Sequence, residues 1–363
     1  MKRMKRKIFW RICKMDGQKK RTALEIIQGY DGPPIRIMEV CGTHTHEIFK
    51  LGIRQILPPQ VELISGPGCP VCVTPIEYVD EALWLALEKN VVVCTFGDLL
   101  RVPGTHMSLA DARSKGADIQ IVYSPIDAYD YALANPDKEV VFLAVGFETT
   151  TPASCLAVKQ AAAKHINNFS LLTANKTMPM AYNSLQGSAD VFLYPGHVDA
   201  IMGTEYAEAL VKQGVSGVVA GFTSKELMTA FAVILAKYPK GTPFFVNCYP
   251  RVVTREGSIE GKKLMAEVME PCDSEWRGLG VIPLSGLMLR PVFALYDARK
   301  KYEIPTLKGK VNPLCRCGDV LQGKCRPPQC SVFGKGCTPD HPIGACMVSQ
   351  EGACSAYYQY GGI

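Results

Sequence analysis

The chain has 363 residues, of which 47% are apolar and 20% are charged, so it is long enough for roughly two or three domains and too apolar to be largely disordered. Its net charge of +6 arises in residues 1–21, which carry +9, whereas the rest of the chain carries −3. A near-neutral body argues against nucleic-acid binding. The sequence has neither the apolar core of a secretory signal, about 7–15 residues, nor the apolar run of about 18 residues that predicts a membrane span.

Short β-type runs alternate with helical patterns along most of the chain. The runs expected as strands are 35–40, 61–65, 91–96, 119–124, 139–146, 171–174, 191–194, 218–221 and 243–248. The main segments expected as helices are 22–30, 44–57, 74–88, part of 108–115, 153–165, 181–185, 224–237 and 255–270. This alternation predicts the α/β class, with parallel sheets covered by helices on both faces.

Two parts of this alternating region resemble each other. A strand followed by Pro-Gly-Cys69 recurs 128 residues later as a strand followed by Pro-Gly-His197, and two further runs recur at offsets of 126 and 124. These steady offsets predict two similar α/β domains, at 35–138 and 139–250, related by an internal repeat. Only the first has a CxxC sequence, so we expect the thiol chemistry there, facing His197 across a cleft.

Two loops rich in soft metal ligands follow the first two expected strands. The first loop holds Cys41, His44 and His46, and the second holds Cys69 and Cys72 in the sequence Gly-Pro-Gly-Cys-Pro-Val-Cys. Ligands of open α/β sheets bind outside the carboxyl ends of the strands. We therefore expect the two loops to meet at one site.

Cys69 and Cys72 have the spacing of a redox-active dithiol that precedes a helix, where the positive end of the helix dipole stabilises a thiolate. The same spacing can chelate a soft metal ion, with Cys41, His44 and His46 as further candidate ligands. The two histidines are two residues apart, so at most one is expected to point with Cys41. Buried structural cysteines and hydrogen-bonding histidines are the alternative interpretation.

The C-terminal segment is rich in cysteine, with seven of the fifteen cysteines of the chain in its last fifty residues. Four of them, with Gly and Pro between them, are the predicted ligands of a second site: Cys330, Cys337, Cys346 and Cys354. Compact sets of four cysteines hold an iron–sulfur cluster or zinc, and spacing without CxxC favours the cluster. The remaining thiols are additional to this set: Cys315, Cys317 and Cys325. Of these, Cys315 and Cys317 are alternative candidate ligands.

A further motif, GFETTTP at 146–152, places Glu148 and three threonines after an expected strand. These side chains could form a hydrogen-bonding wall of the cleft or the capped start of a helix. Nucleotide binding is not indicated, because the chain has neither a phosphate-loop motif nor a dinucleotide-binding glycine motif.

Several long motifs occur in one order along the chain, namely CGTHTH, GPGCPVC, GFETTTP, PGHV and CTPDHPIGACMVSQEGACSAYY. Together they resemble the HypD family of hydrogenase maturation factors, over residues 22–363. The resemblance implies a cytoplasmic scaffold that builds the Fe(CN)2(CO) unit of nickel–iron hydrogenases. It also implies a HypC-type chaperone and a HypE-type cyanide-transfer protein as partners, with no nucleic acid and no membrane.

The resemblance further implies a third domain that is built from the chain ends and holds a [4Fe-4S] cluster. On this interpretation a basic tail and N-terminal helix at 1–34 pack with a C-terminal iron–sulfur domain at 251–363. Carried over to this sequence, Cys41, Cys69 and Cys72 are the essential cleft thiols, and the four predicted ligands named above hold the cluster.

We expect Cys41 and one thiol of the CxxC pair to bind a mononuclear iron that carries cyanide and carbonyl, because thiolates suit a soft, low-spin iron. A cysteine of the HypC-type partner would share this iron. Cys69 and Cys72 would cycle between thiol and disulfide, and His44 would tune a cleft thiolate. The rival hypotheses are a thiol–disulfide oxidoreductase with a structural iron–sulfur cluster and a zinc- or cluster-binding module.

Overall fold

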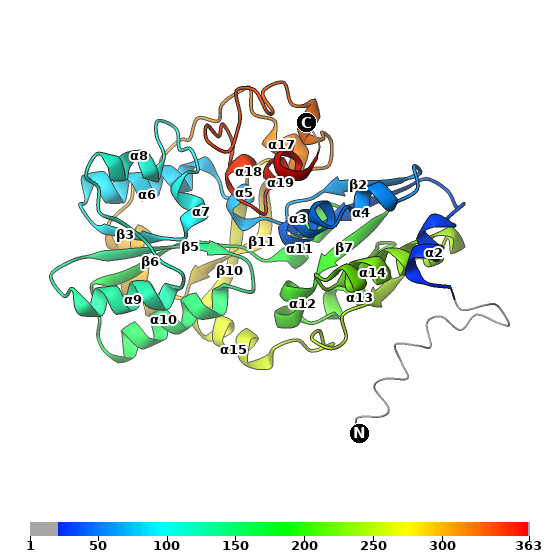
Figure 1. Cartoon of the computed structure of the whole chain (residues 1–363). Helices are drawn as coiled ribbons and strands as arrows, with labels where there is room; N and C mark the ends of the chain where they lie inside the picture. The colour runs from blue at the N-terminus through cyan, green and yellow to red at the C-terminus, as the bar shows by residue number, and fades with distance from the viewer. Residues whose placement is uncertain (1–20, 362–363) are drawn as a thin grey trace.

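Two parallel β-sheets lie side by side in the computed structural model, which describes residues 21–361 (Figure 1). Helices pack on both faces of each sheet, so the predicted α/β class with two parallel-sheet units is confirmed. No helix in this described range is both long and apolar enough to cross a bilayer.

Sheet A is the five-stranded sheet on the right of Figure 1. Its strands, in spatial order, are β2 (Val61–Ser65), β1 (Ile35–Glu39), β7 (Val191–Pro195), β8 (Ser216–Ala220) and β9 (Phe245–Asn247). The helices around it are α2 (Ala23–Gln28), α3 (Gly42–Lys50), α4 (Ile53–Ile56), α11 (Met178–Ser184), α12 (Gly196–Met202), α13 (Glu205–Val211) and α14 (Ser224–Lys237). Successive residues of β1 alternate between its faces, so that Ile37 packs in the core with α14 and Met38 in the core with α11.

Sheet B is the four-stranded sheet on the left of Figure 1. Its strands, in spatial order, are β4 (Ile119–Ile121), β3 (Val92–Thr95), β5 (Val140–Gly146) and β6 (Phe169–Asn175). The helices around it are α6 (Ile76–Glu88), α7 (Gly97–Leu100), α8 (Leu109–Ser114), α9 (Pro125–Ala134) and α10 (Thr151–Ala163). All seven residues of β5 are buried, as expected for the central strand of a parallel sheet with two covered faces.

The two sheets share one strand order, and sheet B is inserted into the chain of sheet A. The strand order is β2-β1-β7-β8-β9 in sheet A and β4-β3-β5-β6 in sheet B. In each sheet, the second strand along the chain lies on one side of the first, and the later strands lie on the other side. The predicted division at residues 138 and 139 does not match this pairing, because β1 pairs with β7, so that β1 and β2 share one sheet with the late strands β7 to β9. The sequence repeat, with its offsets near 126, also aligned strands that are not equivalent in the two sheets. By their place in the strand order, β1 is equivalent to β3 and β7 is equivalent to β5.

Three local expectations differ from the structure. The helix expected at 44–57 is interrupted at Gly52, which has a φ of +65° and separates α3 from α4. The helix expected at 74–88 begins only at Ile76, after Pro75, and the hydroxyl of Thr74 donates to the carbonyl of Pro70. No strand was expected beyond residue 250, yet β10 (Met269–Trp276) and β11 (Gly280–Leu289) form an antiparallel hairpin.

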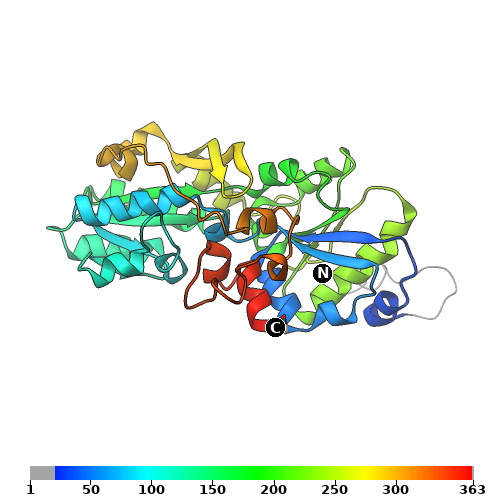
Figure 2. The same cartoon turned by 90° about the horizontal axis from the view of Figure 1, so that it is seen from above.

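The C-terminal third of the chain divides into two parts rather than forming one block. The first part packs beside sheet B and comprises α15 (Ile259–Val268), the β10–β11 hairpin, η2 (Pro291–Tyr296) and α16 (Ala298–Lys301). The second part lies at the junction of the two sheets and comprises α17 (Cys317–Leu321), η3 (Pro327–Gln329), α18 (Ala345–Val348) and α19 (Ala353–Tyr360) (Figure 2).

The N-terminal helix does not pack as predicted. We expected it against the C-terminal domain, but α2 packs against α14 on sheet A, where Ile27 is fully buried. The hydrophobic gain depends on the apolar area that is buried, and Ile27 is buried completely in the core that it shares with α14. The basic tail at 1–20 lies outside the described residues.

Two glycines allow three loops to touch at the ends of β1 and β2. A Cβ atom on Gly68 would lie 2.3 Å from the backbone N and Cα of Cys41, and one on Gly42 would lie 2.4 Å from the backbone oxygen of Glu351. The Gly42 amide also donates to the Gly68 carbonyl at 3.1 Å. These contacts hold the two cysteine-bearing loops and the C-terminal segment together.

We expect Gly68→Ala to lower the free energy of unfolding by about 1–3 kcal/mol, because the backbone of Cys41 has no room for a methyl group. Denaturant unfolding measures the change. Gly97→Ala is the matched control, since its added Cβ would meet only the Cγ2 atom of Ile121, at 3.9 Å. Equal stabilities of the two variants would contradict the close contact.

Candidate functional site

A buried cysteine and a histidine meet where the strand order of sheet A reverses. Cys41 follows β1 and precedes α3, and His197 lies in the first turn of α12 after the neighbouring strand β7. The Cys41 Sγ lies 4.0 Å from the His197 Nδ1, and Cys41 is 1% exposed. The chain leaves β1 and β7 toward opposite sides of the sheet, which is where open α/β sheets bind ligands.

The second predicted loop lies against the first. Cys69 caps the short helix α5 (Pro70–Val73), with its Sγ accepting a hydrogen bond from the Cys72 amide at 3.2 Å. Cys69 is 3% exposed and Cys72 is fully buried. The structure therefore brings Cys41, Cys69 and Cys72 to one region, as the sequence predicted, but encloses their thiols.

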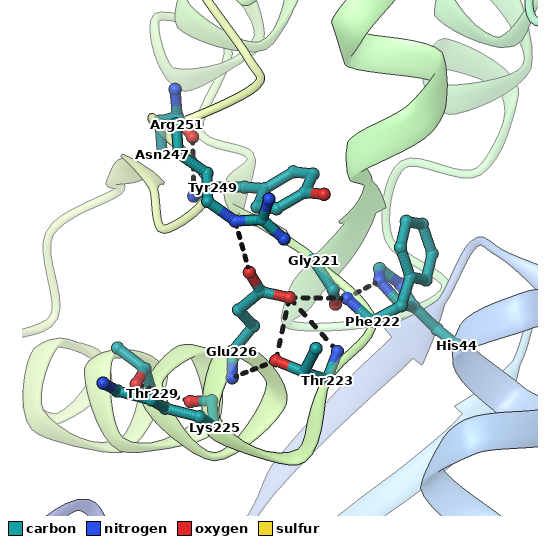
Figure 3. Close-up of polar contacts among 10 residues, drawn as sticks. All are labelled: His44, Gly221, Phe222, Thr223, Lys225, Glu226, Thr229, Asn247, Tyr249 and Arg251. Atoms are coloured by element: carbon teal, nitrogen blue, oxygen red, sulfur yellow. Dashed lines mark hydrogen bonds and ion pairs between the residues drawn. The ribbon is translucent and has the colours of Figure 1, made fainter.

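The ring of the predicted histidine, His44, points to a backbone carbonyl, and it is the backbone amide of His44 that hydrogen-bonds the Cys41 thiol. Its Nε2 lies 3.1 Å from the Gly221 carbonyl, and its ring packs 4.8 Å from that of Phe222 (Figure 3). The imidazole next to Cys41 belongs instead to His197, which the sequence placed only as a wall of the cleft. His46, the other candidate, packs edge-on against Tyr360.

Burial shifts the acidities of the groups at this site. It lowers the pKa of His44 to about 3 and that of His197 to about 4, so both imidazoles are neutral near pH 7. Burial also raises the pKa of the Cys41 thiol, and the nearby Glu351 raises it further. The free site thus holds a protonated thiol beside a neutral imidazole, and a bound cation would be needed to release the proton.

Glu351 is a site residue that the sequence analysis missed. Its Oε1 accepts a hydrogen bond at 2.6 Å from the hydroxyl of Thr43, which lies two residues after Cys41. Burial raises the pKa of this carboxyl. Its place in the C-terminal motif, between Cys346 and Cys354, was the signal available, but only the cysteines of that motif were considered.

A series of thiols leads from the CxxC pair to the C-terminal segment. Cys346 is fully buried and interacts with the thiols of Cys72, Cys317 and Cys354, whose hydrogen bonds lower its pKa. Burial, together with hydrogen bonds to Cys346 and Cys69, raises the pKa of Cys72. The two predicted cysteine sites are therefore in direct contact through Cys346.

An apolar pocket beyond Cys346 is lined by cysteines of the C-terminal segment. Its lining residues are Cys315, Arg316, Cys317, Val320, Cys330, Val332, Phe333, Cys337, Met347 and Cys354. Three of the four predicted cluster ligands line it, whereas Cys346 lies between this pocket and Cys72. Cys315 and Cys317, the alternative candidate ligands, also line the pocket.

The donor set of this pocket fits a cluster better than a single ion. Among residues 21–361 no three His, Cys, Asp or Glu side chains converge closely enough to hold one metal ion. A tetrahedral zinc site needs four donors around one point, whereas the irons of a [4Fe-4S] cluster are bound separately by thiolates. The five cysteines around this apolar pocket could bind the irons of such a cluster separately.

The GFETTTP motif serves mainly as a structural junction. Thr150 precedes α10, as expected for a helix start, and Phe147 packs in one core with Cys69 and Cys72. The Glu148 carboxyl is fully buried, accepts a hydrogen bond from the Met178 amide at 2.8 Å through Oε1, and has no partner for Oε2. Burial raises its pKa to about 7.

Comparisons with known proteins agree with the motifs. The HypD family model, described as the hydrogenase formation hypA family, matches residues 18–361. The chain is 43% identical over 339 residues to the hydrogenase maturation factor HypD of Rhodobacter capsulatus, covering 91% of this chain and 90% of that protein. It is also 43% identical over 335 residues to HypD of Escherichia coli (strain K12), covering 90% and 89%.

We expect Glu148→Gln to stabilise the protein near pH 8 by about 1–3 kcal/mol. The buried carboxyl has its pKa raised from 4.5 to about 7, so its contribution to stability is complete below pH 4.5 and is lost as the pH rises through 7. Glutamine keeps an oxygen for the Met178 amide and stays neutral. Urea unfolding of both proteins across this pH range measures the difference.

The gain should vanish at about pH 4, where the wild-type carboxyl is also protonated. Glu267→Gln is the matched control, because Glu267 forms an exposed ion pair with Lys159 and should show no such pH-dependent gain. A Glu148→Gln variant with an unchanged stability profile would contradict the buried, neutral state of this carboxyl.

Proposed function

Since the chain belongs to the HypD family of hydrogenase maturation factors, we propose that it is the scaffold on which the Fe(CN)2(CO) unit of a nickel–iron hydrogenase is assembled. The observation that carries this proposal is the meeting of three cysteine-bearing segments at one buried place. Cys41 lies there beside His197, and Cys72 contacts Cys346.

The iron unit, as the cargo of this scaffold, would bind through Cys41 and one of Cys69 or Cys72. Thiolates are soft donors that suit a low-spin iron with cyanide and carbonyl ligands. The positive charge of the iron would lower the pKa of Cys41, which burial otherwise raises. A cysteine of a HypC-type chaperone is the proposed additional ligand.

The CxxC pair would supply the electrons for cyanide transfer. Cleavage of an S–CN bond in a thiocyanate group to a thiol and cyanide requires two electrons. Oxidation of the Cys69 and Cys72 thiols to one disulfide releases two electrons and two protons. The protons remain available to the thiol and cyanide that are formed, so the step is balanced.

The C-terminal pocket is the proposed site of a [4Fe-4S] cluster. The candidate ligands are the pocket cysteines Cys315, Cys317, Cys330, Cys337 and Cys354, of which four would be needed. Such a cluster would supply single electrons for reduction of the Cys69–Cys72 disulfide. Cys346 contacts thiols on both sides and so provides the shortest connection between the pocket and Cys72.

The partners proposed for this scaffold are other hydrogenase maturation proteins in the cytoplasm. A HypC-type chaperone would bring the iron, and a HypE-type protein would deliver the cyanide. The alternative function, a thiol–disulfide oxidoreductase, is less well supported, because such an enzyme must expose a thiol to its substrate disulfide. Here Cys69 is only 3% exposed and Cys72 is fully buried.

We expect Cys69→Ala or Cys72→Ala to abolish the infrared bands of iron-bound CN and CO in protein purified anaerobically with its partners. The reason is loss of the dithiol that supplies the electrons for cyanide transfer and one of whose thiols binds the iron. The fold and the iron–sulfur absorbance should persist. Cys272→Ala is the control, since Cys272 lies partly exposed in β10 and outside the thiol series.

Metal analysis of the anaerobic wild-type protein provides an independent check. One cluster and one mononuclear iron predict about five irons per four sulfides. About four irons with full thiol reactivity would favour the oxidoreductase, and zinc without sulfide would favour a zinc module. Normal CN and CO bands in both alanine variants would also refute the scaffold mechanism.

We expect Cys330→Ala and Cys346→Ala to differ in their sulfide content. Cys330 both lines the C-terminal pocket and is a ligand predicted from the sequence, so we take it as one of the four that bind the cluster, and its loss should remove most of the acid-labile sulfide. Cys346 lies outside the pocket lining, so its loss should leave about four sulfides per chain but slow reduction of the Cys69–Cys72 disulfide. Loss of sulfide in Cys346→Ala would instead make Cys346 a ligand.

A further inference from the structure

We propose that Glu226 and Arg251 are positioning residues, which fix the two imidazoles of the site through the loop that follows β8. No sequence motif pointed to either residue. The geometric part of this inference stands on the contacts below, and its consequence for iron loading rests on the proposed function.

The Glu226 carboxylate collects four hydrogen bonds at the start of α14 (Figure 3). Its Oε2 accepts from the amides of Phe222 and Thr223, both at 3.1 Å, and from the Thr223 hydroxyl at 3.0 Å. Its Oε1 accepts from the Arg251 Nε at 2.9 Å. Because two of these donors are backbone amides, the carboxylate fixes the path of the loop rather than one side chain.

The fixed loop touches both histidines. The Gly221 carbonyl lies 3.1 Å from the Nε2 of His44, which defines the orientation of that ring. The Phe222 ring packs 4.8 Å from the His44 ring and, nearly parallel, 5.2 Å from the His197 ring. A shift of Phe222 would therefore move both imidazoles, one of which lies beside the Cys41 thiol.

The packing around the loop leaves little freedom for another conformation. A Cβ on Gly221 would meet the Glu226 Oε2 at 2.3 Å, and one on Gly196, next to His197, would meet the Tyr249 ring at 2.6 Å. The Arg251 guanidinium stacks over the same Tyr249 ring, with its carbon 4.8 Å from the ring centre. One aromatic ring thus couples the guanidinium to the loops that follow β7 and β8.

The exposed fractions of the Glu226 and Arg251 side chains indicate how much their ion pair contributes to folding, as distinct from positioning the loop. The Arg251 side chain is 64% exposed and that of Glu226 is 13% exposed, and such an ion pair contributes little to folding. Loss of the carboxylate, in contrast, leaves two amides of the loop without an acceptor. We therefore expect Glu226 to dominate and Arg251 to contribute less.

The test compares Glu226→Ala, Glu226→Gln and Arg251→Ala in the full chain. The first readout is the 15N spectrum of the histidine rings in the iron-free protein. We expect Glu226→Ala to shift or broaden the ring signals of His44 and His197 and to leave the other four histidines unchanged. Glutamine can still accept from the loop amides through its oxygen and should largely restore the signals.

The second readout is the occupancy of the iron unit, measured by its CN and CO infrared bands, which we expect to fall about tenfold in Glu226→Ala. Glu267→Ala is the matched control, because it breaks an exposed ion pair with Lys159 at 2.7 Å, remote from the site. This control should change neither the ring signals nor the bands.

The two readouts separate failure of this inference from failure of the proposed function. Unchanged His44 and His197 signals in Glu226→Ala would overturn the positioning role, whatever the thermal stability of the variant. Absence of CN and CO bands in the wild-type protein would refute the iron scaffold, while shifted ring signals would still support the positioning role.

Discussion

The close backbone contact between Gly68 and Cys41 is the constraint on which the candidate site depends. Both residues follow adjacent strands of sheet A, and only a residue without a Cβ allows the second loop to lie on the first. The contact of Gly42 with Glu351 adds the C-terminal segment to the same point. These two backbone contacts hold the loops of Cys41 and of Cys69 and Cys72 against the C-terminal segment that contains Cys346.

The nested connectivity explains why the partner of Cys41 comes from far along the chain. Insertion of sheet B between β2 and β7 separates Cys41 from His197 by 156 residues, while β1 and β7 remain neighbours in sheet A. A doubly wound sheet binds ligands where its strand order reverses, and here that position falls between these two strands. In sheet B, Ala345 and Val348 of α18 pack in the core, and the hydroxyl of Ser349 donates to Asp98, which follows β3.

Local sequence signals predicted most strands, several helix ends and the three cleft cysteines, because hydrophobic periodicity and capping act over a few residues. The strand β2 and the helix α14 have the predicted bounds. The pairing of strands could not be predicted in the same way. Because sheet B interrupts the chain of sheet A, strands that are not equivalent recur at similar distances along the sequence. The positions of the His44, His197 and Glu351 side chains could not be predicted for a related reason, because they depend on contacts between segments and not on spacing.

Enclosure gives this site its chemical character. Burial keeps the Cys41 thiol protonated and the two imidazoles neutral, so the free site holds no unpaired charge among these three groups. Glu351 is the acidic group inside the site, and its carboxyl raises the pKa of Cys41. Glu226 and Arg251 lie at the edge, where they fix the loop that orients the rings. The field of a cation bound to Cys41 would decide which thiols lose their protons.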